Sequence, residues 1–242
     1  MTISVFPTKQ ESGAAAARAG ADSIRQAQAA RQVANIIVAT GASQFEVLAC
    51  LISEPGIAWD RVNIFHLDEY IGLPEDHPAG FRNYLRDRFV SRLPCPPMSF
   101  NPVSEEAMAS LNAAVAGFPV DVAFIGIGEN GHIAFNDPPA DFDTEAPYIV
   151  ITLDEACRRQ QLGEGWFPTL DDVPRRAVSM SVRQILKSKA LIVTVPDARK
   201  AAATKAALEG PVTNTCPASI LQTHPDCHIF LDAPAASLLK AT

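Results

Sequence analysis

Clusters of positive charge are scarce in this sequence. It has 20 Lys and Arg residues against 27 Asp and Glu, a net charge of −7, and no basic run exceeds a pair such as Arg158-Arg159 or Arg175-Arg176. Proteins that bind the phosphate backbone of DNA or RNA need clustered cationic side chains. Nucleic acid is therefore not the expected partner. A small phosphate, held by backbone N–H groups and one or two cations, is still compatible with this charge.

Paired cysteines and long apolar runs are absent as well. The five cysteines form no C-x-x-C motif, and the longest apolar runs, such as Ala190–Val195, fall far short of the roughly 20 residues that span a bilayer. The N-terminal segment lacks the basic and then apolar pattern of a secretion signal. We expect a reduced, cytoplasmic protein without a disulfide framework or a membrane role.

Short apolar segments alternate with longer helical stretches along the whole chain. This order is typical of a single α/β domain, here residues 1–242, with a doubly wound, mostly parallel sheet and helices on both faces. The predicted strands are Asn35–Thr40, Val62–Leu67, Val120–Ile127, Ile149–Leu153, Ala177–Ser181, Ala190–Val195 and His228–Leu231. The predicted helices are Glu11–Val33, Ser43–Ser53, Gly80–Val90, Ser104–Ala116, Asp197–Leu208 and a short one at the C-terminus.

In such a sheet the ligand binds beyond the carboxyl ends of the strands. After the first predicted strand, the segment Thr40-Gly41-Ala42-Ser43 opens a helix, so its backbone N–H groups would converge on a phosphate. A tight turn with Ser43 as the helix N-cap is the alternative. The spacing is not that of a P-loop.

Two adjacent carboxylates end the second predicted strand. Asp68 is a candidate general base, and Glu69 would support it or contact the ligand. A solvated turn explains the pair equally well. A metal site built from His66, Asp68 and His77 is a third interpretation, but no recognised ligand spacing supports it.

Gly126, Gly128 and Gly131 match the G-x-G-x-x-G spacing of dinucleotide-binding proteins. A long helix should follow the third glycine, yet Pro138-Pro139 arrives within two turns. The loop is better interpreted as one that presents His132 to a cleft as an acid/base group, unless that histidine only satisfies a loop hydrogen bond. Asp68 and His132 would then face each other.

After the sixth predicted strand, Lys200 lies where it could reach a bound anion, although a solvated lysine is the commoner outcome. No serine stands in a G-x-S-x-G motif, and no cysteine has a motif-level histidine partner. These absences disfavour covalent catalysis.

Two long motifs resemble the signatures of the glucosamine-6-phosphate deaminase/isomerase family, whose superfamily includes 6-phosphogluconolactonase. They are Leu67-Asp68-Glu69-Tyr70-Ile71-Gly72-Leu73-Pro74 with His77-Pro78, and the segment from Gly126 to Pro138. The segment Thr40–Ser43, the residue Lys200 and the late segment Ile220-Leu221-Gln222-x-His224-Pro225 extend the resemblance over nearly the whole chain.

The resemblance implies conversion of glucosamine 6-phosphate and water to fructose 6-phosphate and ammonia, without an organic cofactor. It implies that Asp68 moves the C2 proton to C1 and that His132 opens the sugar ring, oriented by Asn130 and Asp137. No metal is expected, and a sugar phosphate is the expected partner, with a homo-oligomer left open. The expected substrate contacts are Thr40, Gly41, Ala42, Ser43, Glu69, Gly128, Arg159 and Lys200.

Several positions depart from the family pattern. Asn130 replaces an Asp found in some members, Asp137 replaces the usual Glu, and the usual position of a phosphate-clamping arginine falls near Gly163. Arg158 or Arg159 would substitute for that arginine, or the clamp is absent. Galactosamine 6-phosphate, a lactonase activity and a non-catalytic sugar-phosphate-binding domain remain the alternatives.

Overall fold

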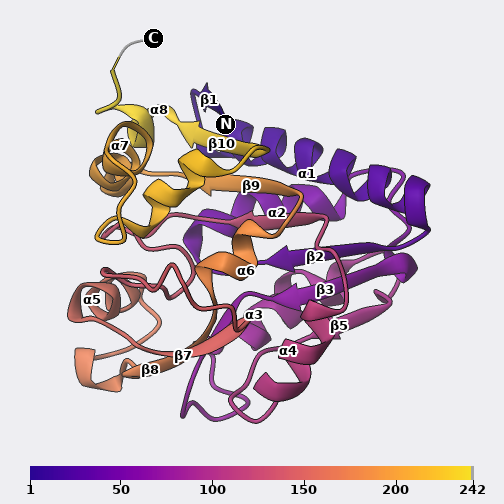
Figure 1. Cartoon of the computed structure of the whole chain (residues 1–242), viewed down its shortest axis with the longest axis horizontal. Coiled ribbons are helices and arrows are strands. Elements are labelled where there is room, and N and C mark those ends of the chain that lie inside the picture. Colours follow the sequence, from indigo (N-terminus) through magenta and orange to yellow (C-terminus); the bar gives the residue numbers. More distant parts are fainter. Residues whose placement is uncertain (241–242) are drawn as a thin grey trace.

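The computed structural model describes residues 1–240, and the fold is an α/β sandwich built on one large sheet (Figure 1). Within these residues, seven strands run in the order β1-β10-β9-β6-β2-β3-β5, and every pairing between them is parallel. Their bounds are β1 Thr2–Phe6, β2 Ala34–Val38, β3 Val62–His66, β5 Ser99–Asn101, β6 Val122–Ile125, β9 Ala190–Val195 and β10 Cys227–Asp232. The predicted fold class is confirmed.

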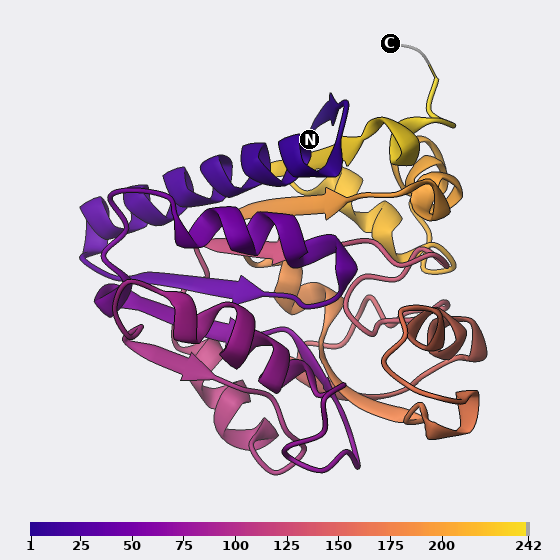
Figure 2. The same ribbon diagram turned by 180° about the vertical axis from the view of Figure 1, so that it is seen from behind.

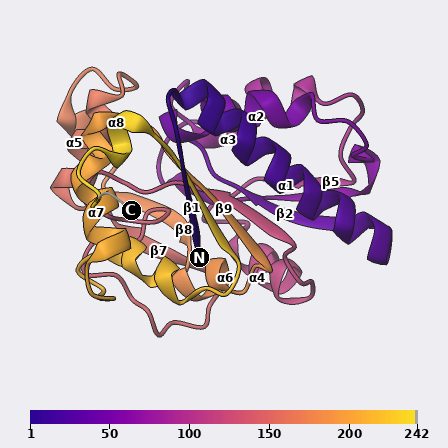
Figure 3. The ribbon, with the colours of Figure 1, turned by 90° about the horizontal axis from the view of Figure 1, so that it is seen from above.

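Helices cover both faces of this sheet, because successive side chains of a strand point to opposite sides. On β2, Ile36 and Val38 pack with α1 Lys9–Arg31, α2 Phe45–Ile52 and α3 Phe81–Arg88. Ile37 packs into the other layer, with α4 Met108–Ala116, α6 Val182–Leu186 and α7 Ala201–Glu209. Figure 3 shows α1, α2 and α3 on one side of the sheet and α4 and α6 on the other, and Figure 2 shows the first layer from behind.

A second, smaller sheet stands beside the carboxyl ends of the parallel strands. It pairs β4 Asp68–Tyr70 with β8 Arg176–Met180 and β7 Tyr148–Thr152, all antiparallel. The prediction that Ile149–Leu153 and Ala177–Ser181 join the parallel sheet is therefore wrong. No helix connects β6 to β7, whereas a parallel neighbour requires such a crossover, and β7 alternates between buried and exposed residues as a one-sided sheet does.

Some elements of the fold are not indicated by the apolar pattern. β1 is a mostly exposed edge strand, and β5 is only partly buried, so neither has the continuous apolar run of a central strand. The helix α5, Glu155–Gly163, is absent from the predicted helices too, whereas α8, Ala233–Ala236, agrees with the short helix expected at the C-terminus. None of the helices within residues 1–240 combines the length and apolar character needed to cross a bilayer.

The first helix lies very close to the sheet at Gly20. A Cβ atom at this position would lie 2.2 Å from two ring atoms of Phe124 in β6, whose side chain is fully buried. We expect Gly20→Ala to lower the free energy of unfolding by about 1–3 kcal/mol, because the core has no room for the methyl group. Denaturant unfolding measures the change.

Gly163 provides the matched control for Gly20. It also lies in a helix, but a Cβ atom there would meet nothing within 4 Å. Gly163→Ala should leave stability unchanged or raise it by up to about 1 kcal/mol, since Ala favours a helix. Equal destabilisation by the two substitutions would show that close packing of α1 is not the cause.

Candidate active site

A cleft that is open to solvent lies at the carboxyl ends of the parallel strands. Its walls come from the segments that follow β2, β3, β6 and β9, and from α5, which stands over this end of the sheet (Figure 1). Its lining residues include Thr40, Gly41, Ala42, Ser43, Asp68, Gly128, His132, Gln160, Gln161, Glu164, Asp197, Arg199 and Lys200. Segments that are far apart in the sequence thus meet in one place, as the position of the strand ends predicts.

The loop after β2 lines the cleft. Gly41 adopts a φ of 90°, a left-handed conformation that favours glycine. Gln44, fully buried, donates to Thr194 Oγ1 (2.9 Å), and Thr194 donates to the Ser43 carbonyl (2.8 Å), so β9 fixes the loop. Ser43 does not cap α2, because it lies inside a short 3₁₀ turn, Ala42–Gln44.

Two features make the cleft suitable for an anion. The hydroxyl of Thr40 is buried and has no hydrogen-bond partner within the described residues 1–240. Lys200, only 7% exposed, lines the same cleft, and burial lowers the pKa of its amine. Arg199 lines it too and pairs with Glu129 at 3.2 Å. A bound anion would satisfy the hydroxyl and compensate the buried ammonium.

Asp68 lies in the cleft wall with 5% of its surface exposed. Burial, and then the negative charge of the neighbouring Glu69, raise the pKa of this carboxyl to about 8. A carboxyl with such a pKa changes protonation state near neutral pH, which suits a group that takes up and returns a proton.

Glu69 is not among the residues that line the cleft. Its carboxylate accepts hydrogen bonds from the backbone N–H groups of Phe81 (3.1 Å) and Arg82 (2.8 Å), and it pairs with the Arg82 guanidinium. Phe81 and Arg82 begin α3, whose own N-cap position is Gly80, with no capping side chain. Glu69 therefore caps α3.

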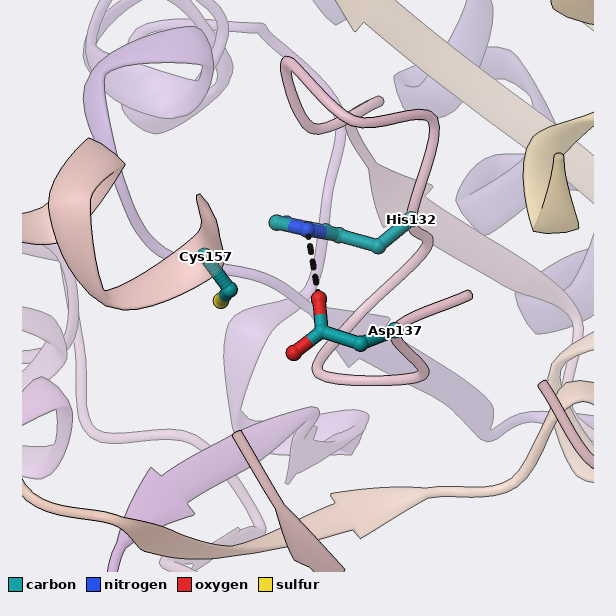
Figure 4. A group of neighbouring side chains, drawn as sticks. All are labelled: His132, Asp137 and Cys157. Carbon is teal, nitrogen blue, oxygen red and sulfur yellow. Dashed lines mark ion pairs between the residues drawn. The ribbon is translucent and has the colours of Figure 1, made fainter. Parts of the chain in front are cut away.

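His132 is fixed by the glycine loop that follows β6. A Cβ atom at Gly128 would lie 2.3 Å from the imidazole, so only glycine lets the ring lie against this part of the backbone. The Nδ1 atom of His132 lies 3.1 Å from Oδ1 of Asp137 (Figure 4). This leaves the other ring nitrogen, Nε2, for a ligand.

Asp137 is itself held in place by hydrogen bonds. Its two oxygens accept from the Asn130 side chain (3.1 Å) and from the backbone N–H of Asp154 (3.0 Å). Burial alone would raise the pKa of Asp137, but the adjacent His132 imidazole and these donors hold it below its ordinary value. The structure thus brings Asn130, His132 and Asp137 together as one unit.

The two candidate clamp arginines do not reach the cleft. Arg158 is buried, and its guanidinium donates to the backbone carbonyls of Val173 and Leu170. The Arg159 side chain is 65% exposed and pairs with Glu155 on the outer side of α5. Arg199 lines the cleft together with Lys200. Its position next to Lys200 in the sequence could have identified it as a candidate.

The two histidines considered for a metal site with Asp68 accept hydrogen bonds from backbone N–H groups instead. His66 is fully buried and accepts the Val103 N–H, and burial lowers its pKa to about 3. The His77 ring accepts the Ala79 N–H. His66, Asp68 and His77 therefore do not form a cluster.

The sequence matches a known protein family. A family model described as glucosamine-6-phosphate isomerases/6-phosphogluconolactonase matches residues 7–229. The chain belongs to this family. A glucosamine-6-phosphate deaminase of Streptococcus pneumoniae (strain 70585) is 34% identical over 207 residues, which cover 84% of this chain and 86% of that protein.

Solved structures of the glucosamine-6-phosphate isomerase/6-phosphogluconolactonase family have the same fold. A monomeric glucosamine-6-phosphate deaminase, described as the missing link of the NagB superfamily, superimposes with a TM-score of 0.88 at 31% identity and covers 98% of this chain and 100% of that one. A putative 6-phosphogluconolactonase from Neisseria gonorrhoeae FA 1090 gives 0.72 at 20% identity, covering 96% of this chain and 99% of that one. At that identity the second likeness shows the fold alone.

Proposed function

We propose that this chain is an enzyme that isomerises and deaminates an amino-sugar phosphate, converting glucosamine 6-phosphate and water to fructose 6-phosphate and ammonia. The observation that carries the proposal is that Asp68 and His132 line the same cleft as the anion-suited set of Thr40, Lys200 and Arg199. The identity of 34% to a glucosamine-6-phosphate deaminase supports this choice of substrate.

In the proposed mechanism the phosphate binds at the loop 40–43 and Lys200, and its binding energy holds the sugar in place for proton transfer. His132 moves a proton between the hydroxyl at C1 and the ring oxygen, which opens the pyranose. The pKa of Asp137 lies below its ordinary value, so this carboxyl keeps its negative charge and stabilises the imidazolium that forms on His132.

Asp68 then removes the proton from C2 and returns it to C1, by way of an enolamine. Water adds to C2 of the resulting imine, and ammonia leaves from the same carbon. Every step is a proton transfer, a water addition or the loss of ammonia, so none requires a nucleophilic side chain.

The direct experiment supplies glucosamine 6-phosphate, galactosamine 6-phosphate and 6-phosphogluconolactone separately to the purified chain. We expect ammonia and fructose 6-phosphate from the first sugar. Lactone hydrolysis without ammonia from either amino sugar would overturn the proposal, and faster turnover of the galactosamine ester would correct the substrate.

The activity should rise with pH, since Asp68 acts as a base only after it loses its proton. We expect kcat/KM to increase through a midpoint near pH 8, the value to which burial and Glu69 raise the pKa of Asp68. Glu69→Gln should move this midpoint to lower pH because it removes the negative charge next to Asp68. A midpoint unchanged in Glu69→Gln would show that another group controls the profile.

A further inference from the structure

Three side chains of different chemistry converge where the glycine loop after β6 meets α5. The imidazole of His132, the carboxylate of Asp137 and the thiol of Cys157 are all buried, and their ligand atoms lie within 4.8 Å of one another (Figure 4). His132 and Asp137 come from the glycine loop, whereas Cys157 lies in the first turn of α5. The proposed reaction uses the first two and leaves the thiol without a role.

The imidazole of His132 faces this group through Nδ1, which is buried and lies 3.1 Å from Oδ1 of Asp137. The spacing of two ligand atoms on a tetrahedral zinc ion with bonds of about 2.0–2.1 Å is about 3.3 Å. The two atoms are therefore already separated as two zinc ligands would be.

The ligand types favour one class of ion. A nitrogen, a carboxylate oxygen and a thiolate sulfur form a mixed set that zinc accepts, whereas Ca²⁺ and Mg²⁺ prefer oxygen ligands alone. The surroundings would orient the ligands, since Asn130 and the Asp154 N–H donate to Asp137, and the backbone N–H of Cys157 donates to the Asp154 carboxylate.

We propose that His132, Asp137 and Cys157 form a three-residue site for zinc or another thiophilic divalent ion, and that the bound ion inhibits the enzyme. Binding displaces the thiol proton to solvent and leaves the fourth coordination position for water. The ion would occupy Nδ1 and the carboxylate that supports it, so His132 would lose its acid/base partner. The inhibition rests on the proposed function, but the binding does not.

The binding test adds Zn²⁺ or Co²⁺ to the purified chain under reducing conditions. We expect one Zn²⁺ per chain by equilibrium dialysis with metal analysis, and an absorption band of thiolate-to-cobalt charge transfer with Co²⁺. Cys157→Ala should remove the band and weaken Zn²⁺ binding by more than about 10-fold. Cys157→Ser, closer in size to the native residue, should do the same and guards against a folding defect.

Cys216 is the matched control because it lies beside the same glycine loop, where a Cβ atom on Gly131 would be 3.1 Å from its sulfur. Cys216→Ala should keep both the cobalt band and the Zn²⁺ affinity. Unchanged binding in both Cys157 variants would overturn the site.

The inhibition test compares turnover of glucosamine 6-phosphate with and without Zn²⁺. We expect Zn²⁺ to inhibit the wild-type chain, while Cys157→Ala keeps its basal turnover and resists the metal. Zn²⁺ bound through Cys157 without loss of turnover would refute the inhibition. A chain that binds Zn²⁺ through Cys157 but releases ammonia from neither amino sugar would refute the proposed function and leave the metal site standing.

Discussion

Asp68→Asn should lower kcat for glucosamine 6-phosphate by about 10³-fold and change KM little. The carboxylate is proposed to move the C2 proton to C1, and an amide of the same shape cannot accept that proton. Because Thr40 and Lys200, proposed to bind the phosphate, are untouched, substrate binding should persist. Steady-state ammonia release and a binding measurement on the variant separate the two effects, and an unchanged kcat would remove Asp68 from the mechanism.

The same substitution should stabilise the fold at high pH. Asp68 has a folded-state pKa of about 8 against an ordinary value of 3.8. Between these two pKa values the carboxyl of Asp68 has lost its proton in the unfolded chain but keeps it in the folded chain. Asp68 therefore lowers the free energy of unfolding by a growing amount as pH rises towards 8. Asn does not titrate, so Asp68→Asn should raise the free energy of unfolding by about 1–3 kcal/mol near pH 8 and hardly at all near pH 4. Equal effects at both pH values would contradict this account.

Lys200→Met should raise KM for the sugar phosphate by about 10- to 100-fold, because a charge-assisted hydrogen bond contributes about 1.5–3 kcal/mol. The side chain is nearly fully buried and lines the cleft together with Thr40, whose hydroxyl lacks a partner within residues 1–240. Weakened competition by inorganic phosphate would show that the loss concerns the anion and not the sugar.

Lys205→Met is the control for Lys200→Met. Lys205 lies in α7, whose N-cap is Lys200, but the Lys205 side chain is 48% exposed and pairs with Glu209. It should leave KM unchanged. If the two variants raise KM equally, the effect comes from the net charge of the chain and not from a contact at the cleft.

Much of the fold could be predicted because central parallel strands are buried on both faces and have continuous apolar sequences, as β2 and β9 do. β7 and β8 are apolar too, but a run of apolar residues does not reveal which strand it pairs with. Their antiparallel pairing with β4 depends on where the chain returns after the glycine loop.

Asp68, His132 and Lys200 could be predicted as site residues because residues that follow parallel strands meet at one edge of the sheet. The placement of Glu69, Arg158 and Cys157 depends on long-range packing, which no local spacing encodes. Glu69 turns to the start of α3, Arg158 turns to the carbonyls of the chain that follows α5, and Cys157 meets the glycine loop only because α5 stands over it.

The two ends of α5 are attached to the molecule in different ways. Its N-cap, Asp154, binds Asp137 through the backbone and Asn130 through its carboxylate, whereas later turns contact the cleft through Gln160 and Gln161, whose partners are Glu129 and Tyr70. The start of α5 thus holds the carboxylate that supports His132, and its later residues Gln160 and Gln161 line the cleft. The acid/base pair and one wall of the cleft therefore depend on the same helix.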